Sequence, residues 1–243
     1  MTVTADILRD RIDDVIADME RRFAGVAPTI QDLIDETLRG DKAAYQQLQS
    51  LGRRLIAPMI DQYGIASGTL AAEWYDLNRD LLKVGGAWSG ATLQGPNVDT
   101  GPLIGGVTTQ FVTAQSIMSG IQSGMDMRVR QAVQGTIMDS VMRDPQARGW
   151  GRVTSAKPCP FCAMLAGRGA VYRTRQTATF MPHLHCACSA LPLWKADPTG
   201  ESMRSREDTI STRRALSDKQ RASQNAQARQ WINDHKAELG LLT

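Results

Sequence analysis

The sequence has 243 residues, of which 42% are hydrophobic and 22% charged, and its formal net charge at pH 7 is +3. This length supports one large domain or two small ones with a substantial core, and the lack of any run of eighteen apolar residues excludes an ordinary membrane-spanning helix. The charged N-terminal segment MTVTADILRDRIDDV has no apolar secretion signal, so we expect the chain to stay in the cytoplasm or to enter an assembly formed there.

The first residues predict a helix. Apolar side chains recur at helical spacing from Ile7 to Phe23, and Thr4 is a candidate N-cap. The segment PTIQDLIDETL (28–38) predicts a second helix with Thr29 as its N-cap.

Two further helices are expected before residue 84. Residues 41–62 carry one apolar stripe, with a kink expected near Gly52 or Pro58. Ser67 is the expected start of a separate helix that runs to Leu81.

The segment 84–106, VGGAWSGATLQGPNVDTGPLIGG, is dense in glycine and proline and predicts a long loop, which is either functional or flexible. Helical spacing returns over 107–143. Gly120, Gly124 and Gly135 interrupt this stretch, either as breaks or as points of close helix contact.

After Pro145 the pattern changes to short strand-like pieces, GRVTSA, AVYRTR and CACSALPLW, followed by a polar tail. We therefore predict a mainly α fold in three parts. Residues 1–145 form a helical body, residues 146–196 a small α+β module that zinc stabilises, and residues 197–243 a polar tail that is helical or disordered.

All four cysteines and two of the three histidines lie between residues 159 and 188, which is far closer than chance would place them. Zinc requires four ligands in a tetrahedron, and the Cys-x2-Cys turn supplies two of them, Cys159 and Cys162. The later run HLHCAC supplies the other two from His183, Cys186 and Cys188, with His185 the weakest candidate. In an extended strand the two cysteines share a side, whereas a turn would bring His183 and Cys186 to the metal.

The cluster predicts a structural metal site and not a catalytic one. A catalytic zinc keeps an open position and has an acid or base nearby, but residues 145–196 contain neither aspartate nor glutamate. A glutaredoxin-like thiol oxidoreductase is the alternative for the pair around Pro160-Phe161, although the two later cysteines do not fit it.

The stretches RGWGRVTSAKPCPFCAMLAGRGAVY and MPHLHCACSALPLW, within residues 148–194, resemble the MuF-like minor head proteins of tailed bacteriophages. The shared pattern is a Cys-x2-Cys, an apolar helix and a closing Pro-His-x-x-Cys-x-Cys strand. The extra histidine and the segment LAAEWYD (70–76) are similar to the actinobacteriophage branch.

The resemblance implies a virion component that binds the portal protein during head assembly, remains inside the head, and aids assembly, DNA packaging or ejection. The major capsid or scaffold protein is a further expected partner. Some relatives are described as capsid maturation proteases, but histidines occur only at 183, 185 and 235, which leaves no good Ser-His pair. We therefore expect no enzymatic activity.

Charge suggests a further contact for such a protein. Residues 1–100 carry ten Lys or Arg against fifteen Asp or Glu, whereas residues 128–175 carry nine Lys or Arg against two Asp. The basic stretch is either a solvated face or a surface for the phosphates of packaged double-stranded DNA, contacted without sequence specificity. The candidate residues for this contact are Arg128, Arg130, Arg148 and Arg152.

Overall fold

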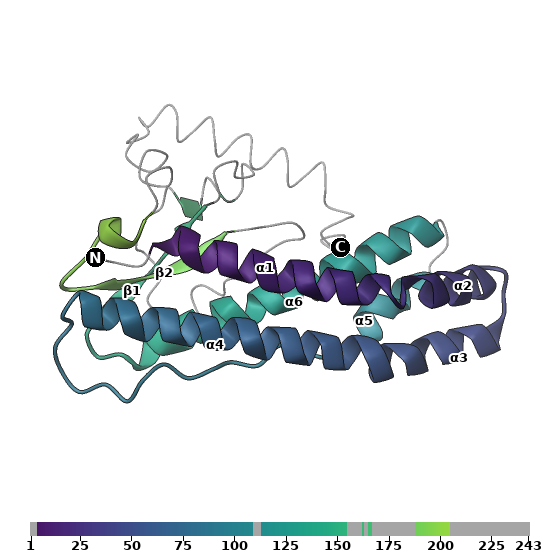
Figure 1. Cartoon of the computed structure of the whole chain (residues 1–243), viewed down its shortest axis with the longest axis horizontal. Coiled ribbons are helices and arrows are strands. Elements are labelled where there is room, and N and C mark those ends of the chain that lie inside the picture. The colour runs from purple at the N-terminus through teal and green to yellow at the C-terminus, as the bar shows by residue number, and fades with distance from the viewer. Residues whose placement is uncertain (1–3, 109–112, 155–161, 163–164, 167–187, 205–243) are drawn as a thin grey trace, which may run out of the picture.

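The computed structural model describes residues 4–108, 113–154, 162, 165, 166 and 188–204. The long helices lie side by side along the longest axis (Figure 1), and a two-stranded sheet lies at the end where α1 (Ala5–Ala24) begins and α4 (Ala57–Leu81) ends. The mainly helical character predicted for the chain is confirmed for the part that the structure describes.

The predicted first helix is confirmed as α1, with Thr4 at the N-cap position. Its apolar stripe is buried because residues three and four apart share one face of a helix. The buried stripe consists of Leu8, Ile12, Ile16, Met19 and Phe23. α1 runs antiparallel to α4, since Tyr63 Oη donates to Asp18 Oδ2 at 2.6 Å and Trp74 Nε1 donates to the Thr4 carbonyl at 3.4 Å.

α2 (Ala27–Leu38) and α3 (Lys42–Leu51) form a helical hairpin that packs against the rest of the body. The N-cap predicted at Thr29 is wrong, because α2 begins at Ala27 and holds Pro28 in its first turn. Proline is tolerated there since the first-turn N–H groups have no partner within the helix. α3 is capped instead by Asp41, whose Oδ1 accepts from the N–H groups of Ala43 and Ala44.

α3 continues into a π-helical segment, η1 (Gly52–Ile56), and then into α4. The irregularity expected near Gly52 or Pro58 is thus a π-helical turn. The separate helix start expected at Ser67 is wrong, because α4 is continuous from Ala57 to Leu81. Ser67 and its neighbours Gly64 and Gly68 do not break the helix. Their small size allows another segment of the chain to make close contact with α4.

That contact is with the loop 84–100, which crosses both α4 and α6 (Ala114–Arg143). A Cβ on Gly64 would lie 2.4 Å from Pro96 Cγ, so the loop touches the α4 backbone. On the other side, the N–H of Gln94 donates to Thr136 Oγ1 of α6 at 2.9 Å. The predicted loop is confirmed as far as Thr100, after which α5 (Gly101–Ile104) and the 3-10 turn η2 (Gly105–Thr108) begin.

The last long helix starts later than predicted. α6 begins at Ala114, where Thr113 and Ser116 form a reciprocal capping box, and not at residue 107. It is unbroken through Gly120, Gly124 and Gly135. Gly124 serves close contact, since a Cβ there would lie 2.2 Å from Leu103 Cδ2.

Two of the predicted strands are confirmed as β1 (Ala147–Val153) and β2 (Ser189–Trp194), which pair antiparallel. Trp150, Leu191 and Trp194 of these strands belong to the same buried cluster as the helices, so the core is continuous across the predicted boundary at residue 145. The cluster also includes Met203 in the short 3-10 turn η3 (Glu201–Met203), within the segment predicted as a polar tail. The remainder of that tail lies outside the described residues.

Candidate functional site

Two of the five predicted zinc ligands lie in the described part of the chain, and both are buried. Cys162 Sγ lies 3.9 Å from Nη1 of Arg152 on β1. Cys188 directly precedes β2, and its neighbour Ser189 pairs with Val153 of β1. One cysteine from each half of the predicted site therefore lies at the same end of the hairpin.

The other predicted ligands, Cys159, His183 and Cys186, lie outside the described residues. Within the described ranges no group of three or more His, Cys, Asp or Glu side chains gathers as a metal site would. Cys162 fits a zinc-binding role in one respect: the Arg152 guanidinium beside it would offset the negative charge of a buried thiolate ligand.

The four arginines predicted to contact DNA do not share one exposed surface. Arg128 and Arg152 are 5% and 3% exposed, so neither lies on the solvent-facing surface of this structure. Arg130 is half-buried and pairs with Asp13 and Asp126, each at 2.7 Å. Arg148 is exposed on β1. Arg128 and Arg130 lie on α6, whereas Arg148 and Arg152 lie on β1.

Gln134 of α6 attaches the hairpin to the helical body. Its Oε1 accepts from the N–H of Ala190 at 2.6 Å, and its Nε2 donates to the Cys188 carbonyl at 3.3 Å. A buried backbone group without a partner is costly. The glutamine amide thus takes the place of a neighbouring strand at the edge of β2, next to Cys188.

Asp144, at the end of α6, is the second attachment point. Its carboxylate is 3% exposed, and its Oδ2 accepts from Trp194 Nε1 at 2.7 Å, Arg79 Nε at 3.0 Å and Tyr75 Oη at 3.2 Å. Oδ1 accepts from the N–H of Gln146 at 2.9 Å. One carboxylate therefore connects α4, the end of α6 and β2.

The charge of Asp144 is maintained by these donors. Burial raises its pKa, but the hydrogen bonds from Gln146, Trp194 and Arg79 outweigh burial, and the pKa lies below the ordinary value. Burial raises the pKa of Tyr75 far above its ordinary range, and the nearby carboxylate raises it further. Tyr75 therefore stays a neutral donor, and the cluster is a structural ion pair, not an acid–base pair near neutral pH.

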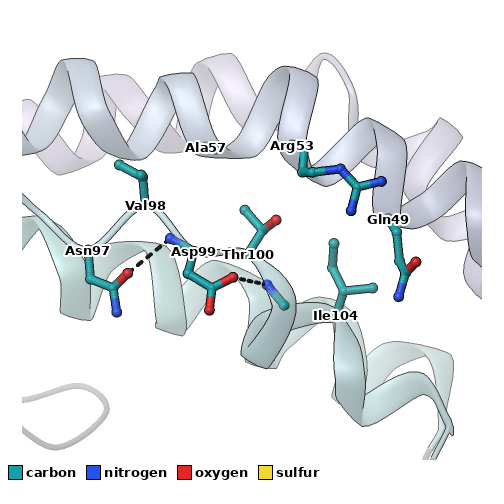
Figure 2. Close-up of a pocket in the computed structure, with 9 residues that line it drawn as sticks. Gln49, Arg53, Ala57, Asn97, Val98, Asp99, Thr100 and Ile104 are labelled. Carbon is teal, nitrogen blue, oxygen red and sulfur yellow. Dashed lines mark hydrogen bonds between the residues drawn. The ribbon is translucent and has the colours of Figure 1, made fainter.

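A pocket of about 500 Å³ lies between the α3–η1–α4 rod and the segment around α5 (Figure 2). Its volume falls within the range of about 300–1,000 Å³ that is typical of ligand sites. The residues that line it are Gln49, Arg53, Ala57, Asn97, Val98, Asp99, Thr100, Gly101 and Ile104.

Sequence reasoning did not single out Arg53, Asp99, Gln134 or Asp144. Asp99 had a local signal, since Asn97 and Asp99 sit in a Gly/Pro-rich loop where such side chains form backbone turns. Asn97 Oδ1 accepts from the N–H of Asp99, and Asp99 Oδ1 accepts from the N–H of Gly101. The roles of Gln134 and Asp144 depend on contacts with residues at least 50 positions away, for which the sequence gives no local signal.

Comparison with known proteins gives one match. A protein-family model described as VG15 protein matches residues 7–212, a range that includes the helices, the hairpin and the cysteine-rich segment. Neither a curated protein nor a solved structure matches the chain. Among the described residues, no helix is both long and apolar enough to span a bilayer.

Proposed function

Because the chain belongs to the VG15 family, a family of phage virion-associated proteins, we propose that it is a minor head protein that binds the portal inside the capsid. The observation that carries this proposal is the extent of the family match, which includes both the helical body and the cysteine-rich segment. The resemblance of residues 148–194 to MuF-like minor head proteins supports the same role. In this role the protein aids head assembly, DNA packaging or ejection and is not an enzyme.

The portal-binding surface that we propose is the exposed side of the α2–α3 hairpin. Asp32, Asp35 and Glu36 are exposed on α2, and they contribute to the negative balance of the first hundred residues. A cluster of like charges guides association with an oppositely charged surface and does so more strongly at low salt.

Co-expression with the portal protein of the same phage tests this role. We expect the chain to co-purify with portal rings, and the triple variant Asp32→Lys, Asp35→Lys, Glu36→Lys to reduce the amount bound. Glu73→Lys with Asp80→Lys is the matched control, since both acids are exposed on α4 away from the hairpin. A chain that never co-purifies with portal rings at any salt concentration would contradict the proposal.

We also propose that the cysteine-rich module holds one structural zinc ion. Cys159 and Cys162 would supply two ligands, and two of His183, Cys186 and Cys188 the others. Zinc supplies cross-linking in such a module and no chemistry of its own. The convergence of Cys162 and Cys188 at one end of the hairpin supports this proposal.

A further inference from the structure

One wall of the pocket is formed by η1, whose backbone has an unusual π-helical conformation. π-helical turns are rare, and they occur often at functional sites because the inserted residue disturbs the regular helix. Gly52, the first residue of η1, lies directly against α5: a Cβ there would be 2.2 Å from Ile104 Cδ1 and 3.3 Å from Thr100 Oγ1. The next residue, Arg53, lines the pocket.

Arg53 carries an available charge at this wall. Its side chain is exposed, and in the described part of the chain its guanidinium makes no hydrogen bond or ion pair. Figure 2 shows the guanidinium extending from the helix on the side of Gln49. A planar guanidinium with free donors matches a carboxylate in a two-point contact.

The opposite wall does not cancel this positive charge. Asp99 is the acid of the pocket, and one of its oxygens already accepts from the N–H of Gly101 at 2.9 Å. Arg128 of α6 lies near enough to interact electrostatically with Asp99, although burial lowers the arginine pKa. Asp99 therefore has a cationic neighbour of its own on α6 and a backbone donor at Gly101, which leaves the charge of Arg53 for a ligand.

Part of the pocket lining is apolar. Ala57 on the α4 side and Ile104 on the α5 side add apolar lining, with Ile104 1% exposed, while Val98 has 40% of its surface exposed. An exposed aliphatic side chain in a pocket gains free energy when a ligand covers it. A nucleic acid backbone would not match this lining, because it offers phosphates and no aliphatic group.

We infer that this pocket docks a peptide segment of a partner protein in which a carboxylate side chain neighbours large aliphatic side chains. The carboxylate binds Arg53, and the aliphatic groups cover Val98. The choice of a protein partner rests on the proposed function, since a virion assembly protein binds other virion proteins.

A peptide titration tests the pocket without any portal protein. The probes are two blocked peptides, acetyl-Leu-Leu-Glu-Leu-amide and its counterpart with Gln in place of Glu, titrated into the full chain by calorimetry. We expect the wild type to prefer the Glu peptide. Arg53→Gln should weaken Glu-peptide binding about tenfold, as expected for losing a hydrogen bond to a charged group, and should leave the Gln peptide unaffected.

Arg54→Gln is the matched control, because Arg54 is exposed on the same π-helical segment but does not line the pocket. It should retain the preference for the Glu peptide. Val98→Ser should weaken the binding of both peptides equally. Failure of both peptides to bind at millimolar concentration overturns the inference, as does an Arg53→Gln variant that binds like the wild type.

Portal co-purification separates this inference from the proposed function. Peptide binding that depends on Arg53, without any association with portal rings, would support the pocket and contradict the portal role. Portal association with no binding of either peptide would leave the function standing and overturn the pocket.

Discussion

Asp144 is a buried polar residue that connects several elements of the described part of the chain. Its carboxylate joins two helices to the hairpin, and its main cationic partner, Arg79, is 5% exposed and also lies 5.4 Å from the ring centroid of Trp88. Removing one partner of a buried pair leaves the other charge buried without compensation. The residue is therefore sensitive even to an isosteric change.

We predict that Asp144→Asn lowers the free energy of unfolding by about 3–5 kcal/mol, because Arg79 loses its buried counter-charge. Asp139→Asn is the control: its pair with Arg143 is 2.7 Å long but partly exposed, and its loss should cost less than about 1 kcal/mol. Urea denaturation of both variants measures the difference. Equal effects of the two substitutions would contradict a structural role for the Asp144 cluster.

The same carboxylate predicts a pH dependence. The pKa of Asp144 is lower in the folded chain than its ordinary value, so the unfolded chain binds its proton first as the pH falls. The contribution of Asp144 to stability is therefore full above about pH 5 and is lost as the pH falls through the folded pKa. The stability difference between wild type and Asp144→Asn should shrink from pH 5 to pH 2. A stability difference that grows as the pH falls from 5 to 2 would contradict the lowered pKa of Asp144.

At the scale of the elements, the helices with a clear apolar stripe were predictable and their contacts were not. α1 follows directly from its spacing of apolar residues. Ser67 was predicted to start a separate helix, whereas it lies inside α4 between Gly64 and Gly68, where the loop 84–100 crosses the helix. Local sequence does not distinguish a glycine that ends a helix from one that accommodates a neighbouring segment.

The contact between the loop 84–100 and α4 predicts opposite effects on stability when two helical glycines are changed to alanine. Gly64→Ala should destabilise the protein by about 1–3 kcal/mol, because the new Cβ would lie within 3.0 Å of three atoms of the rigid Pro96 ring. Gly120→Ala should stabilise it by about 0.5–1 kcal/mol, because nothing lies within 4 Å of that position and alanine favours a helix. Thermal unfolding compares them. A stabilising Gly64→Ala would show that the loop does not press on α4.

The cysteine-rich module gives a prediction of metal dependence. The sequence predicted two strands that the structure describes, and Cys162 lies beside Arg152 of β1 while Cys188 directly precedes β2. The identity of all four ligands stays a prediction. We expect purified protein to contain about one zinc per chain by elemental mass spectrometry. Cys159→Ser should lose it, while His185→Ala should retain it. Wild-type protein without metal, and with an oxidised Cys159–Cys162 pair, would favour the thiol oxidoreductase instead.

At the scale of the whole molecule, the helical body and the hairpin form one core, and the predicted division at residue 145 does not interrupt it. The sequence predicted a boundary there because helical spacing of apolar residues gives way to short strand-like pieces after Pro145. Their union depends on Gln134, Asp144 and Trp194, whose contacts span 50 residues or more. A chain built in this way presents the acidic α2–α3 hairpin and the β1–β2 hairpin on a single body.

The measurement that tests the central claim most directly is quantitative mass spectrometry of purified heads of the phage that encodes the chain. We expect the protein to be present in DNA-filled heads, in a few copies and in a constant ratio to the portal protein. We also expect it to remain with the portal when heads are disrupted at low salt. Heads that contain the portal but lack this chain would contradict the account.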